Sequence, residues 1–152
     1  MLTVPESAPI GKITNLIVRG VASGLADRTA ALTLEIWRAP ITLSLSSPTL
    51  TTSQGGAPVT TTVNVTRNEN FAGSVLLYVD MDGEGGLPAG VTAAFATNPV
   101  TGTTSVLTIT ASATAVTGTH TLWVWAEVSP EFYYVTTLTV TVTQAAGAGG
   151  AP

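Results

Sequence analysis

Few side chains in this sequence could carry out chemistry. The 152 residues include one histidine, His120, no cysteine and nine acidic residues. A Ser-His-Asp triad would need a serine and an acid placed around that single ring, and no Gly-x-Ser-x-Gly turn is present. The acidic residues show no paired pattern of the kind used in glycoside hydrolysis, and no phosphate-binding glycine loop precedes a helix. We therefore expect no catalytic residues and no enzymatic activity of the chain's own.

One acidic stretch, Asp80-Met81-Asp82-Gly83-Glu84-Gly85, has the residue types of a cation site. Closely spaced carboxylates supply the oxygen ligands that calcium prefers. The stretch lacks the ligand spacing and the terminal glutamate of an EF-hand loop, and a solvated hairpin turn has the same composition. Asp80, Asp82 and Glu84 are thus a calcium candidate, with a plain turn as the interpretation that the sequence favours. No other cofactor is expected.

The aromatic residues indicate a binding surface. Successive side chains of a strand point to opposite faces, so residues 118–128 would place His120, Leu122 and Val124 on one face and the two tryptophans on the other. The same alternation turns one tyrosine of 73–80 and the first residues of 133–143 away from the core. The predicted interface residues share this outward position: Tyr78, Trp123, Trp125, Tyr133 and Val135.

An exposed aromatic patch of this size usually marks a contact site. Three interpretations remain open for it. The N-terminal segment of the same chain covers it, other copies or a larger particle bind it, or its rings stack on a carbohydrate. The sole histidine is expected to lie at the edge of the core rather than in a site.

The elements that must position these residues are strands. Apolar residues recur at every second position, and Gly, Pro, Asn and Asp separate the segments. Seven short strands in about 105 residues predict an all-β sandwich of two antiparallel sheets. The predicted strands are residues 41–46, 58–66, 73–80, 91–96, 104–111, 118–128 and 133–143.

Residues 38–143 resemble a recurrent bacterial immunoglobulin-like repeat found in secreted, surface-attached and phage structural proteins. The stretch Gly86-Leu87-Pro88-Ala89-Gly90-Val91 carries most of the resemblance, and in it Gly90 permits a positive φ before the next strand. Further matching segments are Phe71–Leu77, Phe95 with Asn98-Pro99, Ser105–Ile109, and Ala115 with Gly118-Thr119. The resemblance implies an immunoglobulin-like fold and a role as spacer, stalk, adhesion module or particle decoration. It names no ligand.

An internal repeat divides the chain. Segment 2–36 repeats the order of segment 107–142, so the sequence reads as a partial repeat at 1–37, a complete sandwich at 38–144, and a flexible Gly/Ala tail at 145–152. Half a sandwich leaves an apolar face and strand edges uncovered. We expect the first segment to act as a packing or strand-exchange arm, covered by the complete domain, by a neighbouring copy, or by further sequence.

The composition of the chain excludes some classes of binding partner. Only 9% of residues are charged and the formal net charge is −4, so the positive field that nucleic-acid binding needs is absent. The start of the chain has no basic residue followed by an apolar run, and no apolar run reaches the roughly 20 residues that span a bilayer. We expect neither a signal peptide nor membrane insertion.

Together these features predict a non-enzymatic structural module that binds other protein subunits, either as a homo-oligomer or with capsid or fibre proteins. The start without an export signal favours a virion location, such as a phage capsid decoration, tail or fibre protein. The alternative is a stalk, adhesion or carbohydrate-binding module at a bacterial surface or in the extracellular medium.

Overall fold

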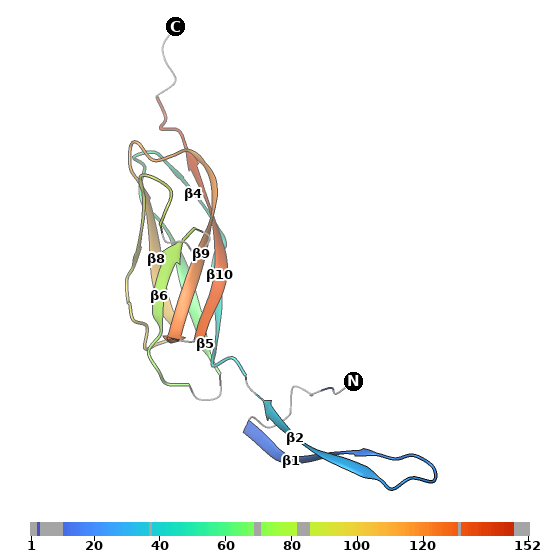
Figure 1. Ribbon diagram of the computed structural model, residues 1–152. Coiled ribbons are helices and arrows are strands. Elements are labelled where there is room, and N and C mark those ends of the chain that lie inside the picture. The colour runs from blue at the N-terminus through green and yellow to red at the C-terminus, as the bar shows by residue number, and fades with distance from the viewer. Residues whose placement is uncertain are drawn as a thin grey trace. The chain divides into compact units, whose positions relative to one another are not determined.

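The computed structural model describes residue 3 and residues 11–36, 38–68, 71–81, 86–130 and 132–147. The chain divides into two units, Met1–Ala39 and Pro40–Pro152, each of which is described by itself. Figure 1 shows strands in both units. The part of the chain that the structure describes contains no helix, and hence none long and apolar enough to cross a membrane.

The first unit is a two-stranded antiparallel hairpin of β1 (Gly11–Gly20) and β2 (Arg28–Ile36). A bulge interrupts the pairing between Ile13 and Leu16. Gly24 allows the turn to adopt a positive φ of 78°. Beside the turn, Asp27 accepts hydrogen bonds from Arg19. Residue Trp37 and most of segment 1–10 lie outside the described residues, as does all of the predicted tail beyond Gly147.

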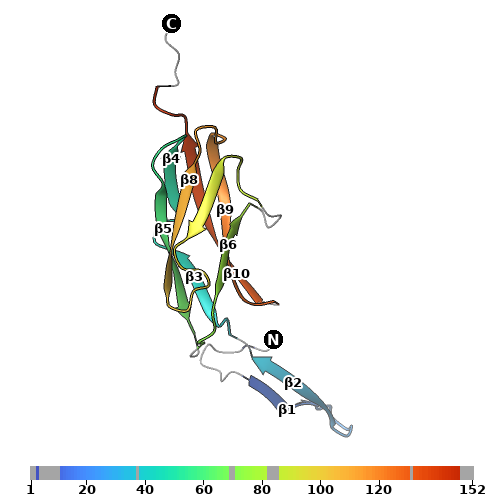
Figure 2. The ribbon, with the colours of Figure 1, turned by 90° about the vertical axis from the view of Figure 1, so that its left-hand side faces the viewer.

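The second unit is a sandwich of two four-stranded sheets, and the predicted all-β immunoglobulin-like class is confirmed. One sheet has the order β3-β5-β8-β7 and the other the order β4-β10-β9-β6. This arrangement contains the A-B-E-D and G-F-C strand orders of an immunoglobulin domain, with β4 added to the second sheet beside β10. Figure 2 shows the two layers. The strands are β3 (Ile41–Leu45), β4 (Thr49–Ser53), β5 (Val59–Arg67), β6 (Leu76–Asp80), β7 (Val91–Phe95), β8 (Thr104–Ala111), β9 (Gly118–Ser129) and β10 (Phe132–Thr143).

The count of seven strands was wrong by one, because β4 was not predicted. The chain leaves β3, turns a corner at Ser46-Ser47-Pro48, and continues as β4 in the other sheet, parallel to the end of β10. The buried Thr61 holds this corner, since its hydroxyl donates to the carbonyl of Ser47 (2.9 Å) and accepts from the N–H of Ser47 (3.1 Å). The Ser/Pro/Thr composition of the corner indicated a loop and concealed the short strand after it.

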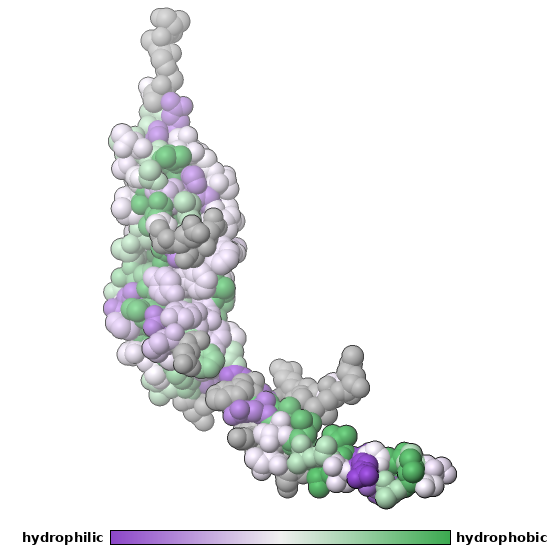
Figure 3. Space-filling view, viewed as in Figure 1, coloured by the Kyte–Doolittle hydropathy of each residue, from purple (hydrophilic) through white to green (hydrophobic). Residues whose placement is uncertain are grey.

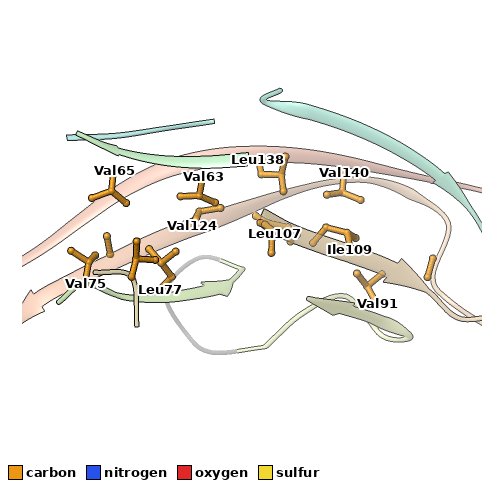
Figure 4. Packing of buried hydrophobic residues seen from close by; sticks show 14 of the residues in the cluster. Val63, Val65, Val75, Leu77, Val91, Leu107, Ile109, Val124, Leu138 and Val140 are labelled. Carbon is orange, nitrogen blue, oxygen red and sulfur yellow. The ribbon is translucent and has the colours of Figure 1, made fainter. Parts of the chain in front are cut away.

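The core lies between the two sheets, and the period-two alternation explains its composition. Figure 4 shows apolar side chains from the inner faces meeting in one layer. Full burial of each Val, Ile or Leu contributes roughly 1.5–3 kcal/mol relative to exposure. The largest fully buried residues are Ile41, Val63, Val65, Val75, Leu77, Val100, Leu107, Ile109, Leu122, Val124, Leu138 and Val140.

Two residues from the segments that carry the sequence resemblance, Gly90 and Asn98, have clear structural roles. Gly90 has a φ of 78°, and a Cβ at this position would lie 2.6 Å from the Cα of Ala115, so only glycine fits. The carboxamide of Asn98 accepts from the N–H of Leu77 (2.8 Å) and donates to its carbonyl (2.7 Å). Because β6 is an edge strand, Asn98 occupies backbone groups that would otherwise be open to another chain.

Candidate functional site

The outer face of the β4-β10-β9-β6 sheet carries the candidate site. Cross-strand pairing places Tyr78 of β6 opposite Trp125 of β9, and Trp125 opposite Val135 of β10. Two pairs further along, on the same face, Tyr133 lies opposite Glu127. The structure therefore brings all five residues predicted for the interface onto one surface, together with Leu76. We call Leu76, Tyr78, Trp123, Trp125, Tyr133 and Val135 the aromatic face.

The three central rings of this face contact one another. The rings of Tyr78 and Trp125 lie nearly parallel, with centroids 6.1 Å apart, and those of Trp123 and Trp125 are tilted by 45°, with centroids 5.3 Å apart. Such arrangements contribute about 0.5–1.5 kcal/mol beyond the burial of area. All three side chains are half-buried. The rings are thus held in place on the sheet surface while part of each stays accessible.

A hydrogen bond fixes the orientation of the central tryptophan. The indole Nε1–H of Trp125 donates to Oδ1 of Asp80 over 2.8 Å. Asp80 lies opposite Trp123 in the ladder and is only 7% exposed. A buried carboxylate is costly without partners, and the indole N–H is one partner that it has. This role was not foreseen from the sequence, because it depends on the register between β6 and β9.

The predicted calcium set is only partly visible. Asp80 is described, while Asp82 and Glu84 lie outside the described residues. Among the residues that the structure does describe, no group of three or more His, Asp or Glu side chains is close enough to hold a metal ion. The calcium hypothesis therefore stays a prediction.

Exposed apolar side chains surround the aromatic cluster. Leu76, Tyr133 and Val135 are 43%, 47% and 47% exposed, and Phe132, at the start of β10, is 50% exposed. The hydroxyl of Tyr133 donates to the carbonyl of Pro130 (2.9 Å), which fixes that ring at the β9–β10 turn. Figure 3 views this side of the sandwich and shows a surface mostly near the middle of the hydropathy scale, with few strongly hydrophilic residues.

The surroundings of Tyr78 raise the pKa of its phenol above the ordinary value of 10.0. Burial is the largest cause, followed by the neighbouring charges of Tyr133, Glu127 and Asp80. Each of these disfavours the phenolate. Tyr78 is therefore neutral at physiological pH and presents a hydroxyl together with its ring.

His120 does not join the aromatic face. Its Nε2 lies 3.3 Å from the carbonyl of Val116, and the side chain is half-buried near the start of β9. The neighbours on its own face along β9 are the buried Leu122 and Val124. It lies at the edge of the core, where the sequence placed it.

Comparison with known proteins finds similarity only at the level of the fold. No protein-family model matches the chain, and no curated protein matches it. Among solved structures, the chain is similar to the BIgI domain of beta protein from S. agalactiae bound to CEACAM1, with 17% identity, 70% of this chain and 99% of that chain covered, and a TM-score of 0.42.

Two further solved structures are similar to this chain. The PapD-like domain 7 of human CEP192 gives 12% identity, coverage of 76% and 94%, and a TM-score of 0.48. A chimeric titin Z1Z2 tandem gives 16% identity, coverage of 86% and 63%, and a TM-score of 0.36.

Proposed function

We propose that this chain is a non-catalytic immunoglobulin-like module that holds a protein partner on its aromatic face. The observation that carries the proposal is a pair of contacting tryptophans on the solvent side of a sheet, of which Trp125 packs on Tyr78 and is fixed by Asp80. Tryptophan and tyrosine dominate the energetic centres of protein interfaces. Rings that are already ordered lose little conformational freedom on binding.

The composition around the rings favours a protein over a carbohydrate. The exposed neighbours Leu76, Phe132 and Val135 are apolar, and an interface centre of this kind excludes water around its anchors. A sugar platform needs polar groups beside the rings to bind hydroxyls. Two polar groups near the rings are already engaged within the module: the carboxylate of Asp80 accepts from Trp125, and the hydroxyl of Tyr133 donates to a backbone carbonyl.

Charged side chains are few among the described residues of the aromatic face, which suits a stable assembly. Glu127 is the one acidic residue that the ladder places between Leu76 and Tyr133. An interface centre depleted in charge is typical of subunits that stay together. The module would serve in this way within a phage virion, as the sequence favoured, or as a stalk or adhesion module at a bacterial surface.

Two valines on opposite sheets provide a matched test. Val135 on the aromatic face is 47% exposed, and Val106 on the outer face of the other sheet is 40% exposed. Val135→Asp and Val106→Asp introduce the same charge at similar exposure in a strand. Fluorescently labelled module is titrated onto particles or cells of the source organism. We expect Val135→Asp to weaken binding by 10-fold or more while Val106→Asp binds as the unaltered chain does.

Two results would count against the proposal. Equal binding by the two variants would mean that another surface makes the contact. Binding of the unaltered module to a glycan array, lost in Val135→Asp, would replace the protein partner by a carbohydrate. Urea unfolding of both variants shows whether any loss of binding comes from loss of fold.

A further inference from the structure

The hairpin β1–β2 pairs in the same register as β9–β10, the last hairpin of the sandwich. Leu16 pairs with Leu32 and Leu122 pairs with Leu138, so both partners are displaced by the same 106 positions. The next four pairs of the first hairpin, from Ile17↔Ala31 to Gly20↔Arg28, correspond to four pairs of the second. Adding 106 to each residue number gives the pairs from Trp123↔Thr137 to Ala126↔Tyr134. The pairing of β9–β10 continues beyond these equivalent pairs to Phe132↔Ser129, so its turn is shorter than that of β1–β2. The repeat seen in the sequence is therefore a repeat of strand pairing.

The bulge in β1 accounts for the one place where the displacement between the two hairpins departs from 106 positions. The pair Gly11↔Ile36 corresponds to the pair Gly118↔Val142. Gly11 and Gly118 are 107 positions apart, whereas Ile36 and Val142 are 106 positions apart. The pairing of β1 shifts by one residue between Ile13 and Leu16. One residue added to a strand is what a bulge inserts. The match thus extends along both strands of the hairpin.

Residues that are buried in β9–β10 have exposed counterparts in β1–β2. Leu122, Val124 and Leu138 are fully buried. Their counterparts are Leu16, which is half-buried, Val18, which is 58% exposed, and Leu32, which is 42% exposed. Leu34 and Ile36 continue the same face. The hairpin therefore has the inward face of a sandwich, and the described residues of the first unit supply no second sheet for it. Figure 3 shows hydrophobic residues at the surface of the hairpin.

A second hairpin is too small to cover this face adequately. Strands of nine and ten residues give a face roughly 30 Å long and about 10 Å wide, or roughly 300 Å². Two such faces would bury about 600 Å², whereas stable protein interfaces bury about 1,200–2,000 Å². In the sandwich, β9–β10 is covered by a whole sheet and flanked by β4 and β6. The apolar face of β1–β2 therefore requires a partner as large as a whole sheet with its flanking strands.

We infer that the apolar face of β1–β2 is a docking site for the other strands of an immunoglobulin-like unit, a set equivalent to β3–β8 (41–111) supplied by a repeat of the same type. The hairpin then forms the last two strands of a second sandwich. Leu16, Val18 and Leu32 enter its core, and Ile17 and Ala31 lie on its outer face, where Trp123 and Thr137 lie in the complete unit.

The test supplies such a set of strands within the same chain. Residues 38–116 of this chain are added before the hairpin of the full-length protein, and amide hydrogen exchange is followed in both hairpins, with β9–β10 as the internal reference. We expect exchange in β1–β2 to slow by roughly 100-fold or more relative to the 152-residue chain. Leu16→Asp in the extended chain should abolish this protection, and Ile17→Asp, on the opposite face of the same strand, should preserve it.

Three results would overturn the inference. Exchange in β1–β2 could be unchanged by the extension while β9–β10 stays protected, or Leu16→Asp and Ile17→Asp could behave alike. The third is a stable dimer of the 152-residue chain, measured by light scattering and lost only in Leu16→Asp, which would make a second copy the occupant. The aromatic face is unchanged in every variant, so the binding assay with Val135→Asp distinguishes failure of this inference from failure of the proposed function.

Discussion

The indole N–H of Trp125 donates a 2.8 Å hydrogen bond to Oδ1 of Asp80, and this contact joins a buried carboxylate of the sandwich to the centre of its aromatic face. The rings of Tyr78 and Trp123 both pack against the same indole. The carboxylate is thereby satisfied, and the ring is held on the solvent side of the sheet. A structural contact and a candidate binding surface thus depend on the same two residues.

Asp80→Ala should lower the free energy of unfolding by about 1–3 kcal/mol, because it leaves the indole N–H without its acceptor and removes the support of the ring. Urea unfolding at neutral pH measures the loss. The control is Asp27→Ala, which removes an exposed ion pair with Arg19 and should leave the unfolding of the sandwich unaltered. Unchanged stability in Asp80→Ala would show that the contact contributes little.

Calcium should leave the thermal midpoint unchanged. Asp80 is almost fully buried and one of its oxygens accepts from Trp125, so this carboxylate is poorly placed to serve a cation in the following loop. Differential scanning calorimetry with millimolar calcium, and with magnesium as the control, tests this. A saturable rise in the midpoint with calcium alone, lost in Asp82→Asn, would restore the calcium hypothesis.

Stability should fall with rising pH above about 10. Burial raises the pKa of Tyr134, and burial with the charges of Tyr133, Glu127 and Asp80 raises that of Tyr78, both from 10.0. A raised folded-state pKa means that the folded chain holds its proton more tightly than the unfolded chain. The stability that these two phenols contribute is therefore fully present below pH 10 and is lost as pH rises through their folded-state pKa values.

Urea unfolding from pH 8 to pH 11 measures this dependence. Tyr78→Phe should make the decline above pH 10 shallower, since it removes one of the two phenols. A decline of equal slope in Tyr78→Phe would mean that Tyr78 does not contribute to it.

Asn98→Ala should expose the edge of β6. The side chain satisfies both backbone groups of Leu77, and loss of these two bonds should cost about 1–3 kcal/mol. The open edge should also promote association. Asn98→Asp is the matched variant, because it still accepts from the N–H of Leu77 but does not donate to its carbonyl. Light scattering and urea unfolding should place Asn98→Asp between the unaltered chain and Asn98→Ala; equal behaviour of all three would contradict the edge-capping role.

The sandwich was predictable from the sequence because its strands alternate cleanly. Leu122 and Val124 are buried and the neighbouring tryptophans half-buried, as the period-two pattern requires. Strand β4 was missed because it is only five residues long and directly follows a corner whose Ser/Pro composition indicated a loop. The position of Asp80 beneath Trp125 depends on the β6–β9 register, which no local pattern specifies.

The predicted set of interface residues rests on the same alternation. The pattern indicated which side chains face outward, and the pairing of β6, β9 and β10 brought them together. Leu76 and Phe132 complete the apolar surroundings, although neither was among the predicted interface residues. The virion location stays a prediction, since it concerns the setting of the module rather than its structure.

Site-specific photo-cross-linking tests the central claim most directly. The photoreactive amino acid p-benzoylphenylalanine replaces Val135 on the aromatic face, or Val106 on the opposite sheet, and the protein is irradiated in its own assembly or on its own cells. A protein-binding aromatic face predicts a discrete adduct of one partner from position 135 and none from position 106. Adducts from position 106 alone, or the same adducts from both positions, would contradict it.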